Sequence, residues 1–142
     1  MDTFSRHLLV EYHGCDPVLL DDASHIEALM RTAATAARVV VVRSVFHRYA
    51  PHGITGVVVI EESHLSVHTW PEHGFAAVDF YTCGGGWPEA CVDVLRDGLR
   101  ASRTEVMLIE RGLDPPQPSM RIRTHYVAQG GVEQVLTAKD ER

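Results

Sequence analysis

Hydrophobic positions in this sequence follow two different spacings. Alternation in runs rich in β-branched and aromatic side chains predicts strands, and these runs cover residues 6–11, 39–49, 54–61, 64–69, 75–82 and 105–109. Spacing of three to four residues predicts two helices, with one apolar stripe of Ile26, Leu29, Met30, Ala33 and Ala37 and another of Cys91, Val94, Leu95 and Leu99. Short turns between the middle strands favour an antiparallel meander.

Each predicted helix has a recognisable start. Ser24 and Glu27 have the spacing of a capping box, in which both side chains bond to free backbone amides of the first turn. Pro88 follows a glycine-rich stretch and suits the first turn of the second helix, where no amide hydrogen is needed. The first helix is therefore expected to begin near residue 24 and the second near residue 88.

We write the predicted order as β-α-β-β-β-α-β, an α+β fold. The two helices pack on one face of an antiparallel sheet, which makes a two-layer sandwich and leaves the other face open. Residues 39–42 and 57–60 are apolar on both sides of their strands. We therefore expect a second copy of the chain to cover the open face, in a homodimer or a higher assembly.

Length and composition indicate one compact domain. With 142 residues, 45% of them hydrophobic, the chain can build one core. We place this domain at residues 1–112. A proline-rich stretch at 115–118 lies in a C-terminal extension, residues 113–142, in which 120–127 are the candidate for one edge strand and 130–142 for a flexible tail.

Charge and hydropathy disfavour several classes of protein. The net charge of −6 disfavours a nucleic-acid partner, whose phosphates require a basic face, and suits a cationic small molecule. Residues 1–6 lack the basic and apolar parts of a secretion signal, and no apolar run of about 18 residues is present. We expect a soluble, cytoplasmic protein without a membrane partner.

Lysine is almost missing from the chain. Lys139, in the polar tail, is the single lysine among 13 basic residues. Pyridoxal phosphate needs a lysine inside an ordered pocket, so this cofactor is not expected. Cys15, Cys83 and Cys91 lack CxxC spacing, so neither a disulfide framework nor a redox centre is expected. Any imine chemistry would need a carbonyl from another source.

The densest polar segment, residues 60–72, interrupts the strand pattern with acids, hydroxyls and imidazoles. Alternation along a strand places His64, Ser66 and His68 on one face. These side chains favour a hydrogen-bonded polar face of the sheet. A zinc site formed by His64, His68 and His73 is a weaker alternative because nothing supplies a fourth ligand, and no metal is expected.

Three motifs in this region carry a resemblance to a known family. They are ESHLSVHTWPE at residues 62–72, YTCG at 81–84 and VFHRYAP at 45–51. With this spacing the chain resembles the small S-adenosylmethionine decarboxylases of bacteria and archaea, over roughly residues 5–112. The extension after Gly112 adds nothing to the likeness.

The resemblance implies that the chain makes its own ketone cofactor. Ser63 would attack the carbonyl of Glu62 and form an ester, and β-elimination would then cut the chain into residues 1–62 and 63–142. The dehydroalanine left at position 63 would hydrolyse to a pyruvoyl group, which would form a Schiff base with the substrate amine and promote loss of carbon dioxide. A pyruvoyl cofactor is consistent with the near absence of lysine.

The resemblance also implies roles for other residues. His68 would be the processing base, assisted by the hydroxyl of Thr55 where the family usually has serine. Cys83 would return a proton to the substrate carbon. Tyr49 would stack on adenine and Glu72 would bind the ribose hydroxyls. In a dimer we expect residues from both copies near each site.

Departures from the family pattern leave the substrate less certain than the chemistry. Tyr49 replaces a usual phenylalanine, His13 replaces a larger aromatic residue, and the glycines at 84–86 stand where an acidic residue usually follows the cysteine-glycine pair. S-adenosylmethionine is the expected substrate, for spermidine and polyamine synthesis, with L-ornithine or L-arginine as the alternative. A second alternative is an unprocessed ligand-binding relative without catalysis.

Overall fold

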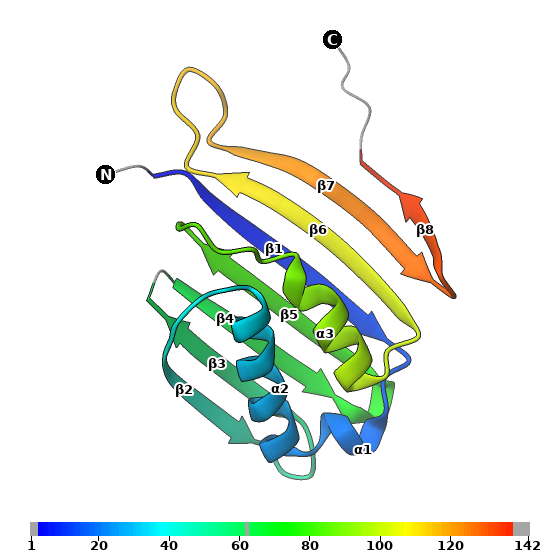
Figure 1. Cartoon of the computed structure of the whole chain (residues 1–142). Coiled ribbons are helices and arrows are strands. Elements are labelled where there is room, and N and C mark those ends of the chain that lie inside the picture. Colours follow the sequence, from blue (N-terminus) through cyan, green and yellow to red (C-terminus); the bar gives the residue numbers. More distant parts are fainter. Residues whose placement is uncertain (1–2, 62, 138–142) are drawn as a thin grey trace.

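The computed structural model describes residues 3–61 and 63–137, so Glu62 lies outside the described residues. Its main feature is one antiparallel sheet with the strand order β2-β3-β4-β5-β1-β6-β7-β8 (Figure 1). The strands are β1 Ser5–His13, β2 Val41–Arg48, β3 Ile54–Ile60, β4 Ser63–Trp70, β5 Phe75–Thr82, β6 Arg103–Arg111, β7 Met120–Gln129 and β8 Val132–Val135. Strand β1 lies between β5 and β6, so the start of the chain runs through the middle of the sheet.

Two long helices, α2 (Ala23–Ala36) and α3 (Ala90–Leu99), pack on one face of the sheet (Figure 1). Their apolar stripes meet the inward residues of the central strands, and the fully buried side chains include Leu8, Ile26, Phe80 and Leu95. Tyr12 is also buried, and its hydroxyl donates to the carbonyl of Val92 on α3 at 2.9 Å. Removal of this apolar surface from water holds the helical layer to the sheet.

The predicted α+β sandwich, with its helices on one face, is confirmed. The predicted order β-α-β-β-β-α-β has three strands between its two helices, whereas four strands, β2 to β5, separate α2 from α3. The predicted residue ranges also contain four strands at this point, so the written order omits one of them. The prediction also lacks a short helix, α1 (Pro17–Leu20), whose four residues are too few to show a helical period. Its N-cap is Asp16, whose side chain accepts a hydrogen bond from the amide of Val18.

The start of α2 differs from the capping-box prediction. Asp22, rather than Ser24, is the N-cap, and its carboxylate accepts a hydrogen bond from the amide of His25 at 3.0 Å. Ser24 already lies in the first helical turn. Aspartate is as strong a cap as serine, and its negative charge also suits the positive end of the helix dipole.

The C-terminal extension forms more regular structure than predicted. Strand β7 pairs with β6 along its whole length, and Tyr126 packs against the core. Strand β8 pairs with residues 126–129, so it covers the end of β7 and leaves the first half of β7 at the edge of the sheet. Residues 132–135 therefore form a strand where a flexible tail is predicted. Gly130 and Gly131 both adopt positive φ, which allows a tight hairpin between the two strands.

The face of the sheet opposite the helices is open in the single chain (Figure 1). Alternation along the strands directs large apolar side chains there, and Val45, Val59 and Trp70 are exposed. A second copy that covers this face stays a prediction. None of the helices within residues 3–61 and 63–137 is long and apolar enough to cross a membrane.

Candidate active site

The candidate site is built on β4, which carries most of the ESHLSVHTW motif. Leu65 and Val67 are buried against the helical layer. Because neighbours along a strand point to opposite faces, His64, Ser66 and His68 reach the open face. The polar face predicted for this strand is therefore present.

Thr55 and His68 form a hydrogen-bonded pair across β3 and β4. Oγ1 of Thr55 lies 2.9 Å from Nδ1 of His68, and the hydroxyl of Tyr49 donates to the same Oγ1 at 3.2 Å. The position of the imidazole proton sets the role of this ring. A proton on Nδ1, donated to Thr55, leaves Nε2 as a basic nitrogen that can accept another.

A surface cavity of about 370 Å³ joins this pair to the carboxylate of Glu72. Tyr49, Thr55, His68 and Glu72 all line it, and Trp70 adds a second aromatic wall. Tyr49 is 47% exposed and Trp70 is 40% exposed, so both rings are accessible to a ligand. The cavity can offer aromatic surface, a carboxylate and an imidazole to one small molecule.

Ser63 and Cys83 lie at the other end of β4 and β5. Ser63 pairs with Thr82, and Cys83 follows directly. Cys83 is exposed, whereas burial raises the pKa of Cys15 to about 11 and that of Cys91 to about 12. Those two thiols are inert core groups, and Cys83 is the cysteine that a substrate can reach.

The backbone at Ser63 is strained. Its φ of 148° is positive and lies in a region that glycine alone adopts readily. The other non-glycine residues with positive φ in the described part of the chain lie near left-handed helical values. Glu61 lines a cavity with Gly85 and Gly86, so the segment before Ser63 lies beside the loop that follows Cys83.

One chain does not bring all the predicted residues together. Ser63 and His68 are five residues apart on one strand, which at about 3.3 Å per residue separates their Cα atoms by about 17 Å. Cys83 groups with Ser63, whereas the other described site residues group with His68 around the cavity. Glu62, the predicted residue before the cleavage point, lies outside the described residues.

A polar cluster centred on Asp79 of β5 is missing from the sequence predictions. Oδ2 of Asp79 accepts from Nε2 of His7 at 2.7 Å, the hydroxyl of Ser66 donates to Oδ1, and His64 lies 3.4 Å from Oδ2. Burial raises the pKa of Asp79, but the bonds from His7 and Ser66 and the charges of the two imidazoles outweigh it and lower the pKa to about 2. The signal in the sequence is a lone carboxylate in the apolar strand FAAVDFYT.

The three histidines considered for zinc are not brought together. His64 contacts Asp79, His68 contacts Thr55, and His73 lies in the short 3₁₀ helix η1 (Pro71–His73). Across the part of the chain that the structure describes, no three or more His, Cys, Asp or Glu side chains are arranged to hold a metal ion. The zinc alternative therefore has no geometric support.

Fold and site together define a class of protein. The chain is a two-layer α+β domain whose strand β4 starts at a strained serine, lies next to an exposed cysteine and carries a paired imidazole on the open face of the sheet. These groups suit covalent and proton-transfer chemistry on a small molecule.

Comparison with known proteins specifies the family. A profile of the family described as S-adenosylmethionine decarboxylase matches residues 6–112. The S-adenosylmethionine decarboxylase proenzyme 2 of Halalkalibacterium halodurans is 45% identical over 118 residues, which are 82% of this chain and 93% of that protein. The proenzyme of Thermotoga maritima is 45% identical over 113 residues, which are 79% of this chain and 87% of that one.

A solved structure agrees with this assignment. The crystal structure of the adenosylmethionine decarboxylase from Aquifex aeolicus superposes with a TM-score of 0.74 at 34% identity, and the match covers 83% of this chain and 98% of that chain. The chain belongs to the S-adenosylmethionine decarboxylase family, as its motifs indicate.

Proposed function

We propose that this chain is a self-processing, pyruvoyl-dependent decarboxylase that converts S-adenosylmethionine to its decarboxylated form and carbon dioxide. The observation that carries the proposal is the strained Ser63, which starts β4 inside the family motif and lies close to Cys83. Membership of the family and the names of the relatives support the substrate. The product would donate aminopropyl groups in spermidine and polyamine synthesis.

Self-cleavage begins with attack of the Ser63 hydroxyl on the carbonyl carbon of Glu62. The peptide nitrogen leaves as a free amine, and an ester joins the two residues. Loss of the α-hydrogen at position 63 then breaks the ester, which leaves a carboxylate at Glu62 and a dehydroalanine at position 63. Water converts the dehydroalanine to pyruvoyl and releases ammonia. Strain at Ser63 favours the process because cleavage removes the constraint on φ.

The residues around position 63 fit a pyruvoyl group. Position 63 pairs with Thr82, so the exposed thiol of Cys83 lies close to the place where the new carbonyl would stand. The pyruvoyl group supplies the electron-withdrawing carbonyl that pyridoxal phosphate supplies elsewhere. We assign Cys83 as the donor that returns a proton to the substrate carbon after carbon dioxide leaves.

At the other end of β4, we assign His68 and Thr55 to processing and Tyr49 and Glu72 to substrate binding. The Tyr49 ring offers a flat face to adenine and attracts the sulfonium charge. A carboxylate only accepts hydrogen bonds, so Glu72 suits the two ribose hydroxyls. All of these side chains line the same cavity, which supports a common ligand.

The two groups of residues would meet in a homodimer with shared active sites. Suppose that the open faces of two copies stack on each other and that a two-fold axis lies between the sheets, perpendicular to the strands. The strands of one copy then run opposite to those of its partner. The Ser63 end of β4 in one copy would then face the His68 end in its partner. The exposed side chains of Val45, Val59 and Trp70 on the open face supply apolar contact area for this arrangement.

The mass of the purified protein tests self-cleavage. We expect two chains, residues 1–62 and 63–142, the second with the mass of a pyruvoyl group in place of serine. Ser63→Ala is the control and should stay one full-length chain. Folded wild-type protein that remains uncut would contradict the proposal and favour a ligand-binding relative without catalysis.

Release of carbon dioxide tests the substrate. S-adenosylmethionine, L-ornithine and L-arginine should be assayed side by side, and we expect turnover of the first. Turnover of either amino acid without turnover of S-adenosylmethionine would contradict the substrate assignment while leaving the pyruvoyl chemistry intact. A fully active monomer in solution would contradict the shared site.

A further inference from the structure

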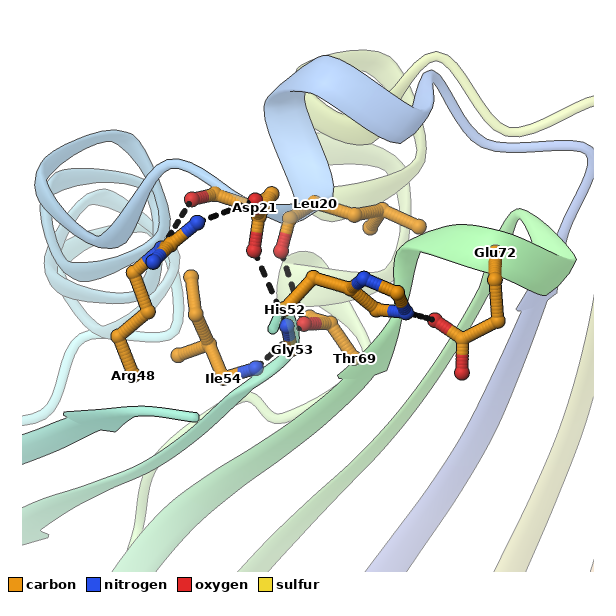
Figure 2. A network of polar contacts seen from close by, with 8 residues as sticks. All are labelled: Leu20, Asp21, Arg48, His52, Gly53, Ile54, Thr69 and Glu72. Atoms are coloured by element: carbon orange, nitrogen blue, oxygen red, sulfur yellow. Dashed lines mark hydrogen bonds and ion pairs between the residues drawn. The ribbon is translucent and has the colours of Figure 1, made fainter. Parts of the chain in front are cut away.

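A histidine outside the predicted site holds the carboxylate of Glu72. Nε2 of His52 lies 2.9 Å from Oε2 of Glu72, and both side chains are 39% exposed. Both also line the cavity that contains Tyr49 and His68. Because a carboxylate only accepts, Nε2 of His52 carries the proton of this bond. Figure 2 shows the imidazole directed at the carboxylate.

The turn that carries His52 is held from both sides. The amide of Gly53 donates to Oδ1 of Asp21 at 3.0 Å, and the carbonyl of Gly53 accepts from the amide of Tyr49 at 2.8 Å. Gly53 has a φ of 104°, and a Cβ there would lie 3.1 Å from the carbonyl oxygen of Thr69. His52 therefore precedes a residue that has little freedom to move.

Asp21 is itself fixed at the junction between α1 and α2 (Figure 2). Arg48, at the end of β2, donates to Oδ2 of Asp21 at 2.6 Å and to its backbone carbonyl at 3.3 Å. The hydrogen bonds from Gly53 and from Arg48 lower the pKa of the Asp21 carboxyl, so this group is ionised in neutral solution. Charge-assisted bonds thus tie the β2–β3 turn to the helical layer.

Thr69 makes a second tie beneath the turn. Its buried hydroxyl donates to the carbonyl of Leu20 at 2.8 Å and accepts from the amide of Ile54 at 2.9 Å. These bonds join α1, β3 and the end of β4, and Glu72 follows within the next turn of chain. His52 and Glu72 therefore sit on two segments that are fixed relative to each other.

We propose that His52 is a positioning residue that orients Glu72 toward the ribose hydroxyls of the substrate, an inference that rests on the function proposed above. The bond to His52 uses one acceptor site and leaves the carboxylate able to accept from two hydroxyls. The hydrogen bond that His52 donates also offsets part of the negative charge of the Glu72 carboxylate. Glu72 is then a better partner for a neutral diol than for the cationic side chain of ornithine or arginine.

Steady-state kinetics of His52→Ala and His52→Gln tests this role, with S-adenosylmethionine and an analogue that lacks both ribose hydroxyls as substrates. His52→Ala should raise KM for S-adenosylmethionine about five- to tenfold, as expected for one lost hydrogen bond, and change kcat by less than about twofold. KM for the analogue should not change. His52→Gln keeps an N–H donor and should recover most of the loss.

The matched control is His73→Ala, which removes an exposed imidazole next to Glu72 and should behave as wild type. Equal increases in KM for both compounds, or an unchanged KM for S-adenosylmethionine, would overturn the role of His52. Far-UV circular dichroism and the extent of self-cleavage report folding. Should His52→Ala fail to fold, His52→Asn, whose amide is too short to reach the carboxylate, takes its place.

Glu72→Gln separates this inference from the function on which it rests. If it raises KM for S-adenosylmethionine and His52→Ala does not, the substrate contact stands and the role of His52 fails. If Glu72→Gln has no effect, or if wild-type protein releases no carbon dioxide from S-adenosylmethionine, the proposed contact fails and the role of His52 fails with it.

Discussion

Asp79 allows a sharp test of the electrostatics on the open face. Its carboxylate accepts from His7 at 2.7 Å and from Ser66, and His64 lies at 3.4 Å. Asp79→Asn keeps the shape of the side chain and one acceptor oxygen but removes the negative charge. We expect this variant to lose the stabilisation that the ionised carboxylate draws from its neighbours.

The magnitude follows from the pKa. Burial alone raises the pKa of Asp79, yet the surrounding bonds and charges lower it from 3.8 to about 2. Each tenfold change in proton affinity corresponds to about 1.4 kcal/mol, so the ionised form contributes about 2 kcal/mol to the free energy of unfolding. Because the folded state has the lower pKa, this contribution is fully present above about pH 4 and is lost as the pH falls through about 2.

Urea unfolding measures the effect, in a Ser63→Ala background where one uncut chain is followed. At about pH 6, Asp79→Asn should lower the free energy of unfolding by about 2 kcal/mol, and the difference should shrink toward about pH 2. All variants should be compared at one protomer concentration, because association also shifts the apparent stability.

Asp114→Asn is the control for this experiment, since Asp114 is exposed in the loop after β6. Its free energy of unfolding should differ much less from that of the Ser63→Ala background at every pH. The reasoning is refuted if Asp79→Asn has the same free energy of unfolding as the Ser63→Ala background at about pH 6. It is also refuted if the loss of free energy stays constant down to about pH 2.

Further substitutions test the other contacts. Ser63→Ala should abolish both self-cleavage and carbon dioxide release with unchanged circular dichroism; a cleaved variant would exclude Ser63 as the nucleophile. Cys83→Ala should still cleave itself, but its turnover should fall about 100-fold because no thiol returns the proton, and full turnover would assign that step to another acid. Tyr49→Phe keeps the ring and should change KM by less than about twofold, whereas Tyr49→Ala should raise it up to about tenfold; equal KM values would argue against stacking. Thr69→Val removes a buried hydroxyl with two partners and should lower the free energy of unfolding by about 1–3 kcal/mol in a urea titration. An unchanged value would show that these two bonds contribute nothing net.

Local periodicity is sufficient to predict the elements that bury a regular apolar stripe. Strands β1 and β3 to β6 and helices α2 and α3 all have one face against a common core, and each has a clear pattern in the sequence. Local periodicity does not predict the strand order, because the insertion of β1 between β5 and β6 depends on contacts between distant segments. Strand β8 has an exposed, weak pattern and depends on pairing with β7, so the sequence does not reveal it.

The motif identifies candidate residues but not the distances between them. The family resemblance predicts that Ser63 and His68 act together in self-cleavage. Their positions on one extended strand keep the two side chains apart within a single chain. The cluster around Asp79 depends on the order of β4, β5 and β1, and the contact between His52 and Glu72 depends on the geometry of the β2–β3 turn. Neither is specified by spacing along the sequence.

The hairpin of β7 and β8 changes what the sheet presents at its margin. Without it, the nine residues of β6 would offer unpaired amides and carbonyls to any extended peptide nearby. With it, the margin consists of the first half of β7, which carries Arg121 and Arg123, and of the four-residue β8, in which Glu133 and Gln134 lie between two exposed valines. Charged and polar side chains at a sheet edge disfavour the addition of another strand, so we expect the extension to lower the tendency of β6 to pair with other chains.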